Sequence, residues 1–442
     1  MLRLRWSNPE PDDLSLPIDW RVPALIIATL FLNFSFWWEH NVDVCVPGPL
    51  LGDAAILGAV SVLTFALFFL GPALATQAAG RPLLGTVANS LGSIPAYGLS
   101  VCCLLFLVGW IATLAEVPGM WWYSVGPRWE LSSTQSRLIA AGVLVFLFHT
   151  GLRGLQVNAR LSRFTIRLAL AFLVAALLRI RGGWTHALGG FPFSGGCSEH
   201  LRLWHGLTWL VSYVGPLGFL AADFGHRSQG RKQVLKIGFF GLVAPLWGTM
   251  FVVSFIALAT FATPFYQPSL EPNVAMALWG QCRRSYAAGF LMISAITTFG
   301  AARFGVMALE KTLPALAANS RRVRWLVLVG LVAVIAWFPI HREAFQALVR
   351  WPATCLVVTA AVLTVDCATA RWRVEQVRNV NWVGLAALMA GCATPLYVPN
   401  SIVGATSDVS WHPWLLPSYG MGLLICLSGR AVQNLTRVQS SS

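Results

Sequence analysis

The feature that most constrains this chain is the recurrence of long apolar runs from one end of the sequence to the other. A bilayer core is about 30 Å thick, so a spanning α-helix needs about 20 apolar residues in succession. The chain has a mean hydropathy of +0.66 and only 11% charged residues, against about a quarter in soluble domains. We therefore expect an all-α integral membrane protein.

On that measure the sequence contains about twelve membrane-spanning helices, with no room between them for a separate soluble domain. We place them at 20–46, 54–76, 93–115, 136–152, 164–181, 204–223, 237–262, 286–309, 325–340, 350–366, 381–398 and 411–428. Residues 1–17 hold no short apolar run followed by a small-residue cleavage site, so we expect the first span to be retained. Residues 1–442 then form a single polytopic unit.

Positive charge gathers in alternate loops, and this pattern predicts the orientation of the chain. The formal net charge is +14. The clusters follow the second, fourth, sixth, eighth and tenth spans, on the side of the first arginines: Arg3, Arg5, Arg81, Arg153–Arg167, Arg227–Lys236, Lys311–Arg324 and Arg371–Arg378. By the positive-inside rule we expect both termini to be cytoplasmic and the protein to lie in the cell (inner) membrane. Charge placed in this way argues against a nucleic-acid partner.

The sixth span carries Gly215-Pro216 and Gly218 in its middle and ends in Asp223 and a basic loop that begins with Arg227. Proline removes a backbone donor and glycine weakens a helix, so polar backbone is expected to be free at membrane depth. Such backbone is tolerated only beside protein or a water-filled cavity, which makes this stretch a candidate binding site. We expect Asp223 to cap the inner end of the span beside a basic residue.

The first span has a comparable interruption. Its apolar run meets Glu39, His40 and Asn41 shortly before a proline-glycine pair, and each central charge in hydrocarbon costs roughly 2.5–3.5 kcal/mol. These residues either face a cavity or lie at the outer surface after a helix that ends at Trp38. Broken helices at matching positions predict an inverted-repeat transporter, with repeats at 20–181 and 204–366 and two further helices in 381–428.

Four short stretches follow one another over about residues 20–385, and each is weak evidence when taken alone. They are Trp37–Val44 with Gly48; Arg81–Gly85 with Pro95 and Gly109-Trp110; Asp223–Arg227; and Thr297–Arg303. Together they resemble the purine-cytosine permease family, the first class of nucleobase-cation symporters. The resemblance implies the five-plus-five inverted repeat of the sodium-coupled leucine transporter group, with discontinuous helices 1 and 6.

The resemblance also implies uptake of a flat heterocycle by symport with Na⁺ or H⁺. The expected substrate is cytosine, uracil, a purine, allantoin or hydantoin. Trp110 is expected to stack on the ring, because an aromatic plane combines contact area with little entropy loss. Tyr213 or Phe219 would cover the other face. Thr297 and Thr298 are expected to supply oxygen ligands to a coupling ion such as Na⁺, and no other cofactor is expected.

Two positions depart from the family pattern, where Arg303 stands in place of an asparagine and Leu114 in place of a polar residue. Arginine is always charged and accepts no hydrogen bond. It either binds an anionic or carbonyl-rich ligand, pairs with Glu39 or Asp223, or extends to the cytoplasmic surface. Together with the residues of the two interrupted spans and the aromatic residues, Arg303 completes the predicted substrate-binding set. This set is Glu39, His40, Asn41, Trp110, Tyr213, Gly215, Gly218, Phe219 and Arg303.

Other functions stay open on the sequence alone. A substrate sensor or a channel on the same scaffold would also fit the altered positions. A membrane enzyme fits less well, because the histidines are scattered and no Cys/His metal spacing or ATP-binding motif occurs. A Cys197–Cys282 bridge and the oligomeric state are undecided. Asp366, which ends the tenth span, is expected to form an interfacial ion pair near Arg371 and Arg373.

Overall fold

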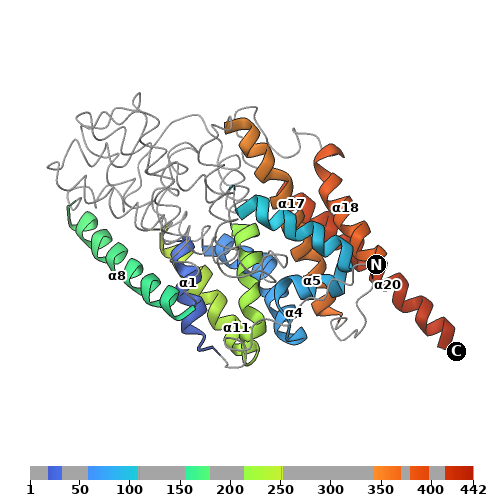
Figure 1. The fold of residues 1–442 in the computed structure, drawn as a ribbon, viewed down its shortest axis with the longest axis horizontal. Coiled ribbons are helices and arrows are strands. Elements are labelled where there is room, and N and C mark those ends of the chain that lie inside the picture. The colour runs from blue at the N-terminus through green and yellow to red at the C-terminus, as the bar shows by residue number, and fades with distance from the viewer. Residues whose placement is uncertain are drawn as a thin grey trace, which may run out of the picture.

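The computed structural model describes residues 18–31, 58–107 with 109, 155–179, 214–249 with 251, 342–369, 379–397 and 414–441. Within these ranges the chain forms helices and short turns and no strand (Figure 1). The α-helices are α1 (Arg21–Phe31), α4 (Gly71–Ala79), α5 (Leu83–Leu91), α8 (Leu155–Arg179), α11 (Arg231–Gly238), α17 (Arg342–Ala368), α18 (Trp382–Tyr397) and α20 (Leu415–Ser441). A 3₁₀ helix, η3 (Ala222–Arg227), and two π-helical turns, η1 (Phe65–Leu70) and η4 (Phe239–Val243), complete the named elements.

The described helices follow the predicted spans closely. Three of them are long and apolar enough to cross a bilayer, Gly58–Ala79, Trp351–Ala368 and Leu415–Thr436, and three shorter apolar helices are Arg21–Phe31, Ser93–Leu107 and Trp382–Tyr397. The predicted fourth, eighth and ninth spans lie outside the described residues.

Four predicted ends differ from the structure: α8 begins at Leu155 rather than near 164, α11 at Arg231 rather than near 237, α17 at Arg342 rather than near 350, and α20 runs on to Ser441. Arginine, lysine and glutamine are good helix formers, so these helices continue past the apolar part of their sequence.

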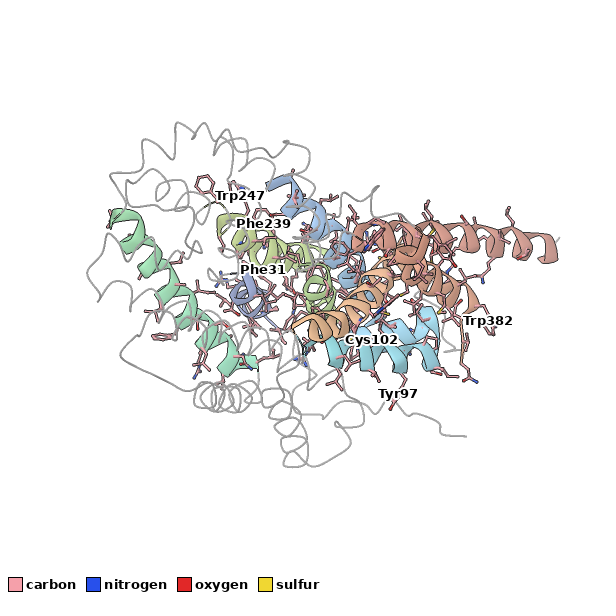
Figure 2. All side chains as sticks on the ribbon, turned by 90° about the horizontal axis from the view of Figure 1, so that it is seen from above. Phe31, Tyr97, Cys102, Phe239, Trp247 and Trp382 are labelled. Carbon is pink, nitrogen blue, oxygen red and sulfur yellow. The ribbon has the colours of Figure 1, made fainter. Side chains whose placement is uncertain are left out.

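The outer faces of the helices are apolar, as in a multi-pass membrane protein. On the helix 93–107 the exposed large side chains are Ile94, Tyr97, Val101 and Leu105, which share one helical face. Its opposite face is buried and carries Cys103 and Phe106, among others. Figure 2 shows Tyr97 on this helix and Trp382 at the start of α18, both extending away from the neighbouring helices. Such an apolar outer stripe suits lipid rather than water.

A π-helical turn interrupts the helix 58–79 directly before a proline. The turn η1 ends at Leu70, and Pro72 follows after one residue. A proline in a helix leaves the carbonyl four residues earlier without its usual donor, and the irregular turn falls where this happens. The hydroxyl of Tyr419 in α20 donates to the Leu67 carbonyl, inside η1, at 3.1 Å. A carbonyl of the irregular turn is thus satisfied by a neighbouring helix.

The second π-helical turn, η4, also lies just before a proline: it ends at Val243, and Pro245 follows after one residue. The two π-helical turns contact each other and α11 contacts η1. Gly238, at the end of α11, allows this approach, because a Cβ there would collide with the rings of Phe65 and Phe69. The two proline-containing helices therefore pack directly at their irregular turns.

A buried ion pair joins α17 to α20. Arg430 and Asp366 are 2% and 3% exposed. The guanidinium donates Nε to Oδ1 at 2.9 Å and Nη2 to Oδ2 at 3.1 Å. Its other donors reach Asn381 Oδ1, Gln433 Oε1 and the Ser90 carbonyl at 3.3, 3.2 and 3.5 Å. The five hydrogen bonds account for all five donors of an arginine.

The ion pair predicted for Asp366 is present, and its carboxylate is buried and binds Arg430, 64 positions away along the chain. Arg371 and Arg373, near which the pair was expected, lie outside the described residues. Asp366 lies in the last turn of α17, and α20 crosses α17 and α18 at this level. The packing of the three helices, which sequence distance does not reveal, selects this arginine.

Removing one partner of this pair should strongly destabilise the protein. Arg430→Gln leaves the Asp366 carboxylate buried and uncompensated, which costs about 3–5 kcal/mol. We expect a large fall in the thermal unfolding temperature of the detergent-solubilised protein, partly restored in Arg430→Gln/Asp366→Asn. The control is Arg21→Gln, whose pair with Asp19 is exposed and 4.0 Å long. Equal falls for the two arginine variants would contradict the assignment.

The contact between the π-helical turns predicts a second stability difference. Gly238→Ala should lower the unfolding temperature, because the added methyl group must push aside the rings of Phe65 and Phe69. Gly248→Ala, on the same span, meets nothing within 4 Å and serves as the matched control. Since alanine is the better helix former, that control should be neutral or slightly stabilising. A harmless Gly238→Ala would show that the two helices do not meet there.

Candidate functional site

Most of the predicted site residues lie outside the described part of the chain. These are Glu39, His40, Asn41, Trp110, Tyr213, Thr297, Thr298 and Arg303. The structure describes the remaining five, which all belong to the sixth span and the loop after it: Gly215, Gly218, Phe219, Asp223 and Arg227. The geometry of the site is therefore built from this span outward.

The sixth span is helical from Val214 to Ala221, and every residue of this segment is buried. Gly215-Pro216 thus belongs to a helix rather than to free backbone. The residues of this span before Val214 lie outside the described part of the chain.

The two glycines of this segment are points of close helix packing. A Cβ on Gly215 would lie 3.0 Å from Val357 of α17, and one on Gly218 would lie 3.5 Å from Phe68 of η1. Phe219 is fully buried. The contacts of these residues in the structure are with neighbouring helices, and their predicted roles in substrate binding stay predictions.

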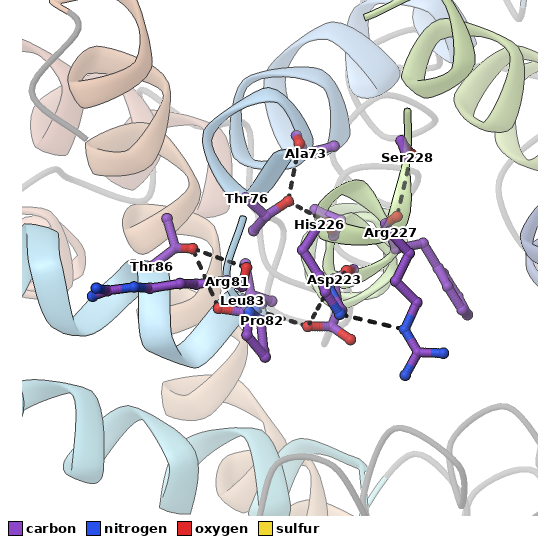
Figure 3. Close-up of polar contacts among 12 residues, drawn as sticks. Ala73, Thr76, Arg81, Pro82, Leu83, Thr86, Asp223, His226, Arg227 and Ser228 are labelled. Atoms are coloured by element: carbon purple, nitrogen blue, oxygen red, sulfur yellow. Dashed lines mark hydrogen bonds and ion pairs between the residues drawn. The ribbon is translucent and has the colours of Figure 1, made fainter. Parts of the chain in front are cut away.

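Asp223 connects the end of the sixth span to the start of α5. Its Oδ1 accepts a hydrogen bond of 2.8 Å from the backbone N–H of Leu83, the first residue of α5 (Figure 3). The residue before α5 is Pro82, which has no side-chain acceptor for the free amides of the first turn. A carboxylate at a helix N-terminus also meets the positive end of the helix dipole. Asp223 therefore acts as the cap of a helix more than a hundred residues earlier in the chain.

The 3₁₀ helix η3 lies tightly against α4. The Thr76 hydroxyl is 2.9 Å from the carbonyl of Ala73 and 2.9 Å from that of Ala222, so it links its own helix to η3. A Cβ on Gly225 would collide with the Ala73 carbonyl oxygen and with Thr76 Oγ1. Glycine is required at this position by the approach of the two backbones. This contact holds Asp223 at the right distance from α5.

His226 and Arg227 extend the cluster. His226 Nδ1 pairs with the Asp223 carbonyl and lies 3.8 Å from Asp223 Oδ1. Arg227 Nε donates to His226 Nε2 at 3.3 Å. Because Nε2 accepts, this arrangement fits the neutral histidine with its hydrogen on Nδ1. The basic residue beside Asp223 is thus a histidine, and Arg227 contacts that histidine.

The cluster joins two of the stretches that carry the family resemblance. Arg81–Gly85 and Asp223–Arg227 meet through the Leu83–Asp223 hydrogen bond. The cluster can hold together the end of the sixth span with η3, the helix α4 and the start of α5. Its only anionic group, the Asp223 carboxylate, accepts a hydrogen bond from the N-terminus of α5. Sequence reasoning missed Thr76 and Leu83. A usable signal was Arg81-Pro82 at a helix start with no Ser, Thr, Asp or Asn to cap it.

The residues the structure describes contain no group of three His, Cys, Asp or Glu that could hold a metal ion. The predicted ion ligands Thr297 and Thr298 lie outside these residues, so the prediction of a Na⁺ site stands as made.

The sequence matches no family model and no curated protein, whereas the fold matches solved structures over nearly the whole chain. A nucleobase-cation-symport-1 family transporter, Mhp1, closed with bromovinylhydantoin bound, has a TM-score of 0.62 at 12% identity over 95% of each chain. A Na⁺-coupled sialic acid symporter has a TM-score of 0.56 at 10% identity over 94% of this chain and 88% of the other. The Eremococcus coleocola manganese transporter has a TM-score of 0.53 at 13% identity over 98% and 99%.

These comparisons confirm the predicted fold class and the structural resemblance to nucleobase-cation symporters. The chain has the all-helical fold of leucine-transporter-type membrane proteins. The structures it resembles are transporters rather than enzymes. Sequence identities of 10–13% to these structures show the fold only. The substrate has to be inferred from the residues of the site.

The cap geometry predicts a graded response at Asp223. Asp223→Asn keeps an oxygen acceptor for the Leu83 amide and should retain most of the stability. Asp223→Ala removes the acceptor and should cost about 1–2 kcal/mol, seen as a lower unfolding temperature. Asp19→Ala is the control, because that carboxylate is exposed and its bond to the Arg21 amide is 3.3 Å long. Equal losses for the asparagine and alanine variants would rule out the capping role.

Proposed function

We propose that this protein is a secondary active transporter that takes up a nucleobase or a related heterocycle by symport with Na⁺ or H⁺. The observation that carries the proposal is the fold likeness to Mhp1 over 95% of both chains. The order of the four sequence motifs supports it independently. Residues 20–181 and 204–366 are the two proposed inverted repeats, and 381–428 supplies two further helices.

The paired π-helical turns support this repeat. They lie in the proposed second and seventh spans, which occupy equivalent positions in a five-plus-five arrangement. Each turn ends one residue before a proline, at Pro72 and Pro245. The same irregularity at the same place in two halves is what a repeat predicts.

The proposed substrate site uses Trp110 as the stacking plane, with Glu39, His40, Asn41 and Arg303 as polar contacts. Mhp1 is described with bromovinylhydantoin bound, and a flat ring of that kind suits an aromatic platform. Tyr213 or Phe219 would cover the second face, beside Gly215 and Gly218.

The proposed coupling ion binds at Thr297 and Thr298. In alternating access the cluster around Asp223 would hold the inner end of the sixth span to α4 and α5, with Arg227 beside it. The proposed orientation has both termini in the cytoplasm of a cell whose inner membrane contains the protein. The Leu83–Asp223 contact supports it, since it brings the basic loops after the second and sixth spans to one side.

Uptake into proteoliposomes tests the proposal. Labelled cytosine, uracil, hypoxanthine, allantoin and hydantoin are offered with and without a Na⁺ or pH gradient. Accumulation of one of them above the outside concentration, lost when an ionophore removes the gradient, is the expected result. Equilibration without accumulation would indicate a channel, and binding without uptake would indicate a sensor. Failure of all five to bind or enter would overturn the proposed substrate class.

Trp110→Ala should weaken binding of the transported ring by about tenfold or more, because one stacked base contributes about 1–3 kcal/mol. The matched control is Trp382→Ala, since that side chain is 75% exposed at the start of α18. The dissociation constant is measured by equilibrium binding with the labelled substrate. Unchanged affinity in Trp110→Ala would remove Trp110 from the site.

A further inference from the structure

Trp20, the residue before α1, has two cations close to its ring. The guanidinium carbon of Arg21 is 5.9 Å from the centroid of the Trp20 ring, and Lys236 Nζ is 5.6 Å from it. Both distances are within the range of cation–π attraction. The ring of Phe240 lies against the same indole, with centroids 5.3 Å apart. Trp20 thus joins the start of α1 to α11 and η4.

This surface, which we call the Trp20 surface, consists of Trp20, Arg21, Lys232, Lys236 and Phe240. Lys232, Lys236 and Phe240 follow at intervals of four, so they share one helical face, and all three are exposed. Neither α1 nor α11 contains a carboxylate, and the acid nearest to them in the described sequence is Asp19, two residues before α1. It lies 4.0 Å from Arg21 Nε and accepts a hydrogen bond from the Arg21 amide. Three cations therefore face one acid that already has a structural partner.

The charges give way to apolar rings within about one helical turn, or about 5.4 Å. Phe239 and Phe240 are each 50% exposed, although both are large apolar side chains. The order along the helix is thus cations at Lys232 and Lys236, then exposed rings at Phe239 and Phe240. Cations beside tryptophan, with apolar surface below, match the profile of a bilayer from headgroup to acyl chain.

We propose that the Trp20 surface binds an anionic phospholipid, with its phosphate at the cations Arg21, Lys232 and Lys236 and its acyl chains over Phe239 and Phe240. A small soluble anion would use the cations and leave the rings uncovered. An acidic protein partner would have to reach rings that lie at membrane depth. A phospholipid satisfies both parts of the surface at once. The inference does not depend on the substrate of the transporter.

The chain supplies a matched control on α8, which also contacts α1 (Figure 1). Arg160, Arg163 and Arg167 are exposed on one face of α8, and the described residues of α8 include no acid and no tryptophan. Replacing these three arginines removes the same charge as replacing Arg21, Lys232 and Lys236. The comparison separates a built site from general attraction between a basic protein and an anionic membrane.

Native mass spectrometry of the delipidated full chain measures the binding of phosphatidylglycerol and of phosphatidylcholine with the same acyl chains. We expect one phosphatidylglycerol to bind more tightly than phosphatidylcholine. Arg21→Gln/Lys236→Gln should weaken it by roughly fivefold for each charge removed, the usual effect of one cation near an anionic surface. Trp20→Leu, which keeps every charge, should also weaken it. Arg160→Gln/Arg163→Gln/Arg167→Gln should leave this first lipid in place.

Three results would overturn the inference. Equal losses in the α8 variant and the triple Arg21→Gln/Lys232→Gln/Lys236→Gln variant would mean diffuse electrostatics. Displacement of the lipid by millimolar inorganic phosphate would mean a small-anion site. No preference for phosphatidylglycerol in the wild-type protein would mean no site at all. Thermal unfolding of each variant shows that lost binding is not lost folding. The arginine and lysine variants should unfold near the wild-type temperature because their side chains are exposed, and Trp20→Leu keeps an apolar side chain beside Phe240.

Discussion

Inside hydrocarbon no water is present to satisfy a backbone carbonyl or a charged side chain, and the described structure depends on how this chain meets that constraint. Pro72 and Pro245 each deprive a carbonyl of its usual donor, and in both places the helix adopts a π-helical turn just before the proline. At the first of these, Tyr419 from α20 donates to the Leu67 carbonyl. The irregular turns then pack on each other across Gly238 instead of facing lipid.

The same constraint governs the charged groups. Asp366 and Arg430 are buried together, and Arg430 finds an acceptor for every donor it has. Asp223 is partly buried and occupies the free amide at the start of α5. Exposed cations such as Arg21 and Lys236 instead gather at helix ends beside aromatic rings. Among these described residues, the buried charges are paired within the protein and the exposed cations lie at helix ends.

The relation between the sequence and the site differs from residue to residue. Hydropathy predicted the positions of the described spans to within a few residues, except where polar and charged residues extended α8, α11, α17 and α20. Asp223 was predicted to cap the inner end of the sixth span, whereas its carboxylate caps the start of α5. Leu83 is 140 positions away, and only the packing of η3 on α4 through Thr76 and Gly225 brings the two together. Asp366 was assigned to nearby arginines for the same reason, since sequence distance does not reveal which helices cross.

The sequence by itself determined that this is a many-helix membrane protein, because apolar runs of bilayer length leave no other way to satisfy the backbone. Its motif order also pointed to the transporter fold that the structural comparisons confirmed. Only the tertiary structure decided which partners the buried polar groups take. It paired Asp366 with Arg430, set Asp223 on α5, gave the Leu67 carbonyl to Tyr419 and brought Lys236 to Trp20. Each of these contacts joins segments far apart in the chain, and their geometry depends on how the helices cross.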